Sequence, residues 1–207
     1  ALMTAVYPDF RKTMIPALVI FAVLAGTLLS MPDTLVSARK ASIFRSYRIN
    51  GVPALSILII PGLSVLLHLI VVSAIITIAS PVFFDGPPPT NWLGFVLAFL
   101  LIAVACASLS LLIGVISTST QMRVLWAQLI FLPSMILGGL MMPSSILPAG
   151  LARIGMLLPT TYGMRVFAGL GYNQPPEGGV LLPALILLSA SAVAFILALS
   201  LFTWDTP

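Results

Sequence analysis

Long uninterrupted apolar segments are the dominant pattern of this chain. Charged side chains are absent from five stretches of 20 residues or more, at 13–32, 49–84, 86–122, 124–152 and 178–204. A helix needs roughly 20 mostly apolar residues to cross the hydrocarbon core of a bilayer. Each stretch can hold one such helix, so the pattern predicts an all-α, polytopic membrane helical bundle.

We expect five membrane-spanning helices within a single transmembrane domain. The expected spans cover about 14–32, 55–80, 92–116, 124–141 and 180–204 of residues 1–207. The segment PVFFDGPPPTN, between the second and third spans, is rich in proline and glycine and predicts a loop. The apolar stretch from Met142 to Gly179 is interrupted by five prolines. It therefore predicts one or two short interfacial or re-entrant helices rather than another span.

The composition excludes several classes of protein. Apolar residues make up 60% of the 207 and charged residues 7%, against about 45–50% and about 25% in soluble domains. A water-soluble enzyme, a disordered chain and a secreted disulfide scaffold are thereby excluded. Cys106 is the single cysteine, so no internal disulfide or cysteine metal cluster can form. The net charge of +4 comes from cations spread along the chain, which we interpret as topology signals, and we expect no nucleic-acid partner.

Lysine and arginine predict the orientation in the membrane. Four of the nine cations lie in the connection between the first two spans, residues 33–52, and short cation-rich loops stay on the cytoplasmic side. This puts that loop and the C-terminus inside and residues 1–13 outside. Because the chain starts outside without Met or a signal peptide, we expect one further span ahead of Ala1, making these five spans part of six.

The sequence shows no equipment for catalysis. It has no glycine-rich phosphate loop, no zinc-protease motif and no paired carboxylates within a span. We therefore expect no enzyme activity, no catalytic residue, no metal site and no cofactor bound by this chain. No span interior holds Asp, Glu, Lys or Arg, which argues against a proton- or sodium-coupled carrier. For His68, inside the second span, we favour an interhelical hydrogen bond over a proton relay.

The segment SARKASIFRSYR, residues 37–48, predicts a short amphipathic helix on the cytoplasmic surface. On a helical wheel Ile43, Phe44 and Tyr47 share one face, while Arg45 lies on another. Two interpretations stay open from this segment alone. It can anchor the chain to lipid head groups, or it can serve as a docking helix for a cytoplasmic partner.

Further motifs follow this helix in a characteristic order. NGVP at Asn50–Pro53 precedes the second span, and Leu137-Gly138-Gly139 with Pro143 ends the fourth. Pro148 and LPTTY at Leu158–Tyr162 come next. This order resembles the permease subunit of the type-2 ABC exporter superfamily, the drug, lipid and polysaccharide exporters. The resemblance covers essentially the whole chain and implies that the family's first span is missing here. A glycine replaces the serine usual at 138, and the acids usual around the cytoplasmic helix are absent.

The resemblance implies a partner and an assembly. A cytoplasmic ATP-binding cassette subunit would bind ATP and Mg²⁺ and drive this chain. The chain would act as a homodimer, or as a pseudo-dimer with a second permease, in the inner membrane of a prokaryotic cell. Residues 143–172 would form re-entrant helices on the extracellular side.

The resemblance also implies two sets of site residues. Contact with the ATPase would fall on the cytoplasmic coupling helix and the turn after it, at Arg39, Lys40, Phe44, Arg45, Tyr47, Arg48, Gly51 and Pro53. The substrate pathway would be lined mainly by the first and fourth spans, with Phe21, Leu24, Phe131 and Met135 as candidates.

We therefore expect the transmembrane subunit of an ATP-driven exporter. Its uncharged spans suit a hydrophobic or amphiphilic cargo, either drug-like or lipid-like. The alternative is a membrane scaffold or binding subunit of another complex that transports nothing itself. A secondary carrier is less favoured, because the spans lack ionisable groups for ion coupling.

Overall fold

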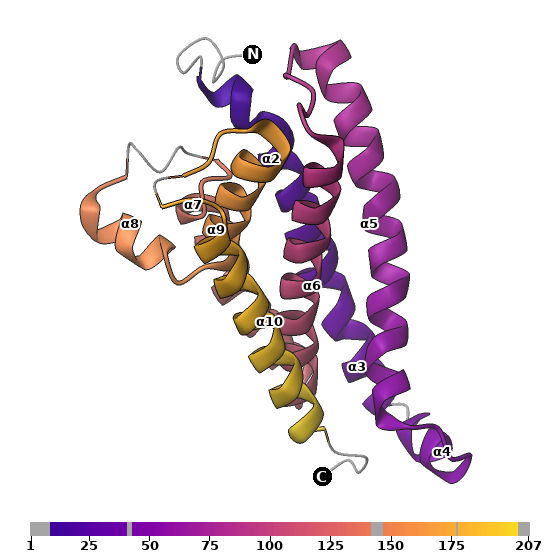
Figure 1. Ribbon diagram of the computed structural model, residues 1–207. Helices are drawn as coiled ribbons and strands as arrows, with labels where there is room; N and C mark the ends of the chain where they lie inside the picture. The colour runs from indigo at the N-terminus through magenta and orange to yellow at the C-terminus, as the bar shows by residue number, and fades with distance from the viewer. Residues whose placement is uncertain (1–8, 41–42, 142–146, 177, 203–207) are drawn as a thin grey trace.

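The computed structural model describes residues 9–40, 43–141, 147–176 and 178–202. Every regular element within these ranges is helical, which confirms the all-α class. Long helices run roughly lengthwise through the molecule, and shorter ones lie at one end and on one side (Figure 1).

Among the described residues, four helices are long and apolar enough to cross a membrane. They are Thr13–Ala38, Leu55–Phe84, Trp92–Ile116 and Leu181–Ser200, and they coincide with the expected first, second, third and fifth spans. Helix α7 (Thr120–Leu137) takes the place of the expected fourth span. It carries Gln121 and Arg123 in its first turn and is not one of the four. The count of five spans therefore stays a prediction.

The first span continues beyond its expected end at Pro32. It consists of α2 (Asp9–Ala25), the π-helical turn η1 (Gly26–Ser30) and α3 (Met31–Lys40). Pro32 lies in the first turn of α3, where proline is tolerated. Because proline has no N–H, the carbonyl of Leu28 loses its usual donor four residues on, which accounts for the widened turn just before α3.

The second span is a single helix, α5 (Ala54–Phe84), with Pro61 and Pro81 inside it. It passes its expected end at Ser80 by one turn and stops at Asp85, which adopts a left-handed conformation with φ of 51°. The short helix α4 (Ile43–Ile49) lies between α3 and α5.

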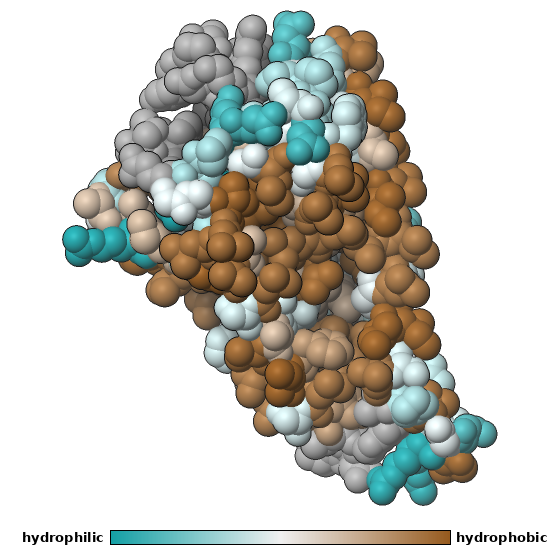
Figure 2. Space-filling view, viewed as in Figure 1, coloured by the Kyte–Doolittle hydropathy of each residue, from teal (hydrophilic) through white to brown (hydrophobic). Residues whose placement is uncertain are grey.

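Helix α6 (Trp92–Ile116) forms the centre of the bundle. It packs against α2, α3, α9, η3 and α10 (Leu181–Ser200), and buried side chains recur along its whole length. Helix α5 lies at the edge, with only 17% of its apolar window buried against 56% for α6. Figure 2 shows apolar surface over most of this face, with hydrophilic residues gathered at the top, at the left by α8 and at the lower end by α4. Such a surface suits contact with lipid rather than water.

Two short helices occur within the region expected to be re-entrant: α8 (Ala149–Gly155) and α9 (Pro159–Val166). A second π-helical turn, η3 (Phe167–Gly171), continues α9. Its close approach to α6 requires glycine at position 94, because a Cβ there would collide with the carbonyl oxygen of Leu170. The extracellular location of these helices stays a prediction.

Candidate coupling surface and substrate pathway

Helix α4 is fastened to the bundle by one aromatic side chain. Phe44 is 2% exposed, and its ring centroid lies 5.5 Å from that of Phe202. It belongs to a buried cluster with Leu35 of α3, Leu58 of α5 and Leu111 of α6. Because this cluster, which also includes Ala198 of α10, joins five helices, a displacement of α4 must move the bundle end with it or expose apolar surface.

The rest of α4 faces outward. Arg45, Tyr47 and Arg48 are all exposed, Tyr47 by 41%. Of the three residues that the helical wheel places on one face, Phe44 is buried in the bundle, whereas Ile43 and Tyr47 are exposed. At seven residues α4 has about two turns, too few for a continuous apolar stripe, and Phe44 alone is buried. Arg39 and Lys40 end α3, and their side chains lie outside the described residues.

The turn after α4 explains the glycine and proline of the NGVP motif. The N–H of Gly51 donates to Arg48 O at 3.1 Å, and that of Val52 donates to Tyr47 O at 3.0 Å. These two bonds form a Schellman cap, in which Gly51 adopts the required left-handed conformation with φ of +70°. Pro53 is extended and stands at the N-cap position, just before α5 begins at Ala54. Both residues thus set the angle between α4 and α5, while their contact with an ATPase stays a prediction.

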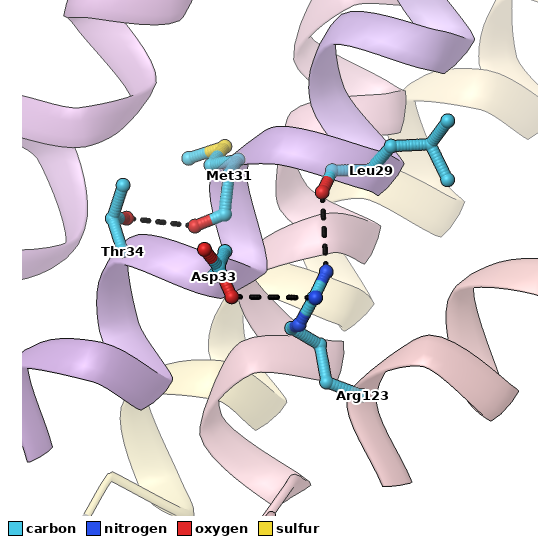
Figure 3. Close-up of polar contacts among 5 residues, drawn as sticks. All are labelled: Leu29, Met31, Asp33, Thr34 and Arg123. Atoms are coloured by element: carbon cyan, nitrogen blue, oxygen red, sulfur yellow. Dashed lines mark hydrogen bonds and ion pairs between the residues drawn. The ribbon is translucent and has the colours of Figure 1, made fainter. Parts of the chain in front are cut away.

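A charged contact that sequence reasoning missed links α7 to the first span (Figure 3). The Arg123 guanidinium donates to Leu29 O at 3.1 Å through one nitrogen and lies 3.3 Å from an Asp33 carboxylate oxygen through another. The Arg123 side chain is 12% exposed and that of Asp33 is 52% exposed. We call this set of contacts the Arg123 clamp.

The clamp compensates for an unfavourable position. A cation in the first turn of a helix opposes the positive end of the helix dipole, and Arg123 stands in the first turn of α7. The Asp33 carboxylate and the Leu29 carbonyl supply the missing negative charge. The sequence held one signal for this pair. Asp33 and Arg123 were both predicted on the cytoplasmic side, each as the only residue of its charge in its loop.

The widened turn η1 also forms a hydrogen bond with α6. The buried hydroxyl of Ser110 in α6 donates to Thr27 O at 2.7 Å. Helices α6 and α7 therefore both contact the irregular turn at which the first span changes from α2 to α3.

The four candidate pathway residues come together between α2 and α7. The rings of Phe21 and Phe131 lie 6.0 Å apart, with an angle of 52° between their planes. Leu24 and Phe131 belong to the main buried cluster, and Met135 packs against it. Phe21 alone of the four is more than a third exposed, at 37%. Their role in a pathway stays a prediction.

The outer faces of the two helices around these residues are apolar. Leu18 and Leu29 lie exposed on the first span, and α7 exposes several side chains of the same kind. Those of α7 include Leu125, Leu129, Leu132 and Ile136.

Other residues considered from the sequence fall outside this site. His68 lies exposed on α5, and Cys106 is buried in α6. Within the described parts of the chain, no group of three or more His, Cys, Asp or Glu is placed to hold a metal ion. Arg165 lies over the ring of Tyr162 in α9, 5.8 Å from the centroid.

Comparison with known proteins gives one match. The family model described as ABC-2 type transporter matches residues 2–172, well over half of the chain. No curated protein and no solved structure matches. The family match agrees with the apolar helices and with the motif order of the sequence. The chain therefore belongs to the ABC-2 type transporter family, as a membrane-embedded permease component of an ABC transporter.

Proposed function

We propose that this chain is the transmembrane subunit of an ATP-driven exporter of hydrophobic or amphiphilic molecules. A cytoplasmic ATP-binding cassette subunit, which holds ATP and Mg²⁺, docks on α4. The observation that carries the proposal is α4 itself. It is a basic helix at one end of the bundle that is anchored through Phe44 and presents Arg45 and Tyr47 outward.

The contacts around α4 support a route for the driving force. Closure of the ATPase pair pushes on α4, and the Phe44 cluster transfers that push to α3. The Arg123 clamp then links α3 and η1 to the first turn of α7. Movement of α4 thereby changes the relation between α2 and α7, the two helices that carry the candidate pathway residues.

The exposed apolar faces of α2 and α7 support the location of the pathway. In a homodimer or pseudo-dimer, these faces of two permeases meet in the cell membrane. The cargo moves between them past Phe21, while Phe131 and Met135 back the wall. The exposed side chains described on this face, among them Phe21 and Leu129, are apolar, and they suit a hydrophobic or amphiphilic cargo.

Charge reversal on α4 tests this function. We expect the double variant R45E/R48E to weaken binding of the ATP-binding cassette subunit by about tenfold, since each exposed pair contributes about 0.2–1 kcal/mol and reversal adds repulsion. Binding is measured by co-purification of the tagged permease with each cassette subunit of the same genome. Transport is then measured with that subunit in proteoliposomes.

The matched control is R153E, which reverses an exposed arginine on α8. Unchanged binding and unchanged ATPase coupling in R45E/R48E would contradict the role of α4. A complex that forms normally and hydrolyses ATP, but moves no hydrophobic probe such as a lipophilic dye, would instead favour the scaffold function.

Thiol labelling tests the orientation independently. Cys106 is fully buried in α6, so C106A gives a background without its own thiol and at small cost. In that background we expect Ser46→Cys, on α4, to react with a membrane-impermeant maleimide only after cells are opened. Pro88→Cys, in the loop between α5 and α6, should react in intact cells. The reverse pattern would place α4 outside and overturn the docking of a cytoplasmic ATPase.

A further inference from the structure

A cavity of about 400 Å³ lies between α5, α6, α10 and Thr27 of η1, and its lining includes none of the four candidate pathway residues. The space exists because several side chains of α6 and α10 on its walls are small, namely Ala103, Ala107 and Ala192. Gly62 lines it from α5, the edge helix of the bundle. Its volume is in the range of sites that hold small apolar ligands.

The wall of the cavity is mostly apolar and presents few hydrogen-bonding groups to a bound molecule. Three hydroxyls lie on its wall, and one of them belongs to Ser108 of α6. Of the other two, that of Thr27 donates to Val23 O at 2.7 Å and that of Ser191 donates to Leu188 O at 2.8 Å. Both hydrogens are thus used within their own helices. Water needs several polar partners to occupy a cavity, so this lining favours a hydrocarbon.

The cavity opens onto the surface that faces the membrane. Ile59, Leu63 and Val104 line it, and they are 46%, 55% and 47% exposed. Along α5 it extends from Leu58 to Leu69, about 16 Å at the helical rise of ~1.5 Å per residue. This length matches one leaflet of the hydrocarbon core, which is about half of ~30 Å. An acyl chain of the surrounding bilayer therefore fits both the opening and the length.

Charge distinguishes the two ends of α5, and the cavity lies toward the end that meets α4. Leu58 and Leu111 belong both to its wall and to the cluster around Phe44, so its lower end lies against α4. Arg45, next to Phe44, is exposed there. The other end of α5, well beyond the last lining residue Leu69, carries an acid, Asp85. Cations at a membrane surface attract anionic head groups.

We propose that this cavity holds one acyl chain of an anionic phospholipid, with the head group at the α4 end of the bundle beside Arg45. The bound chain fills the space between α5 and α6 and supports the edge helix. This site is separate from the export pathway, and binding requires neither the ATPase subunit nor transport.

Photo-crosslinking of the purified permease tests the proposal without any partner. The protein is placed in nanodiscs of phosphatidylcholine that contain a small fraction of phosphatidylglycerol with a diazirine in its acyl chain. We expect adducts to concentrate on residues 103–111 and 191–195 and to fall at least fivefold when unlabelled phosphatidylglycerol is added. Adducts spread evenly along α5, at Ile70 and Ile78 as much as in the cavity, would overturn the site.

Filling the cavity provides the matched comparison. Ala192→Phe adds bulk at an exposed lining position of α10, and Val104→Phe does the same on α6. Each should lower the adduct yield at 103–111 at least fivefold. Ala190→Phe, exposed on α10 but outside the lining, should leave it unchanged.

Equal labelling by a phosphatidylcholine probe would overturn the head-group assignment. Unchanged adduct yield in both filled variants would overturn the cavity as the binding site. Because none of these measurements involves ATP hydrolysis, their failure is distinct from failure of the export function.

Discussion

Replacing Arg123 by alanine is expected to abolish most substrate transport while ATP hydrolysis by the bound cassette subunit continues. The Arg123 clamp is the charged contact between α7 and the first span, with Leu29 O at 3.1 Å and Asp33 at 3.3 Å. A hydrogen bond to a charged group contributes about 1.5–3 kcal/mol when the group is well shielded. Loss of this contact therefore lowers the equilibrium constant for the association of α3 with α7 by roughly tenfold or more.

A graded series separates this coupling role from a merely structural one. Asp33 is half exposed, so water screens its charge and D33N should lose less transport than R123A. R123K keeps the charge but not the forked geometry, and it should fall between the two. R153A removes an exposed arginine from α8 and serves as the control.

The measurement is the ratio of substrate moved to ATP hydrolysed in proteoliposomes. A fall in this ratio with hydrolysis preserved is the expected outcome for R123A. If hydrolysis and complex assembly disappear together with transport, the clamp acts by holding the fold. Transport equal to that of the unmodified permease would contradict the proposed route from α4 to α7.

Replacing Phe44 by alanine is expected to detach α4 from the bundle. Phe44 is 2% exposed and lies 5.5 Å from the ring of Phe202. Truncation of a buried phenylalanine to alanine costs about 3–5 kcal/mol, through lost burial and the cavity left behind. Helix α4 has only seven residues, and Phe44 is its one buried side chain. Most of the lost free energy therefore weakens the packing of α4 against the bundle.

Hydrogen exchange of the purified permease measures the detachment. Backbone amides of α4 in F44A should exchange at least about a hundredfold faster, since each ~1.4 kcal/mol corresponds to a factor of ten. Y47A is the control, because Tyr47 is 41% exposed. It should leave the exchange of α4 unchanged and still weaken binding of the cassette subunit. Unaltered exchange in F44A would mean that other contacts hold α4.

Sequence reasoning recovered the long helices because their signal is local. An uncharged apolar run must be helical inside a bilayer, since each backbone group needs an internal partner there. The ends of these helices were harder to predict. Pro32 reads as a stop in the sequence, yet it lies in the first turn of α3, where its missing N–H costs little. Helix α5 likewise continues through Pro81 to Phe84.

The amphipathic helix shows what helical periodicity in a sequence can predict and what it cannot. The sequence predicts one amphipathic helix over residues 37–48, but the structure divides this segment: Ser37–Lys40 end α3, and the short helix α4 begins at Ile43. A helical wheel cannot tell which apolar residue meets a neighbour, however. The tertiary structure buries Phe44 against α3, α5 and α6 and leaves Tyr47 exposed. The NGVP motif supplied a resemblance, and the structure adds its physical reason, a left-handed cap at Gly51.

The amino-acid sequence is enough to predict a helical membrane protein, because the spacing of its charges decides which segments can enter hydrocarbon. It also showed that no P-loop is present to supply energy from within the chain. The tertiary structure alone decided which distant residues meet. The Arg123 clamp joins positions 90 residues apart in Asp33 and Arg123, and the walls of the cavity come from α5, α6, α10 and η1. Such contacts depend on how whole helices pack, and no local pattern along the chain encodes that packing.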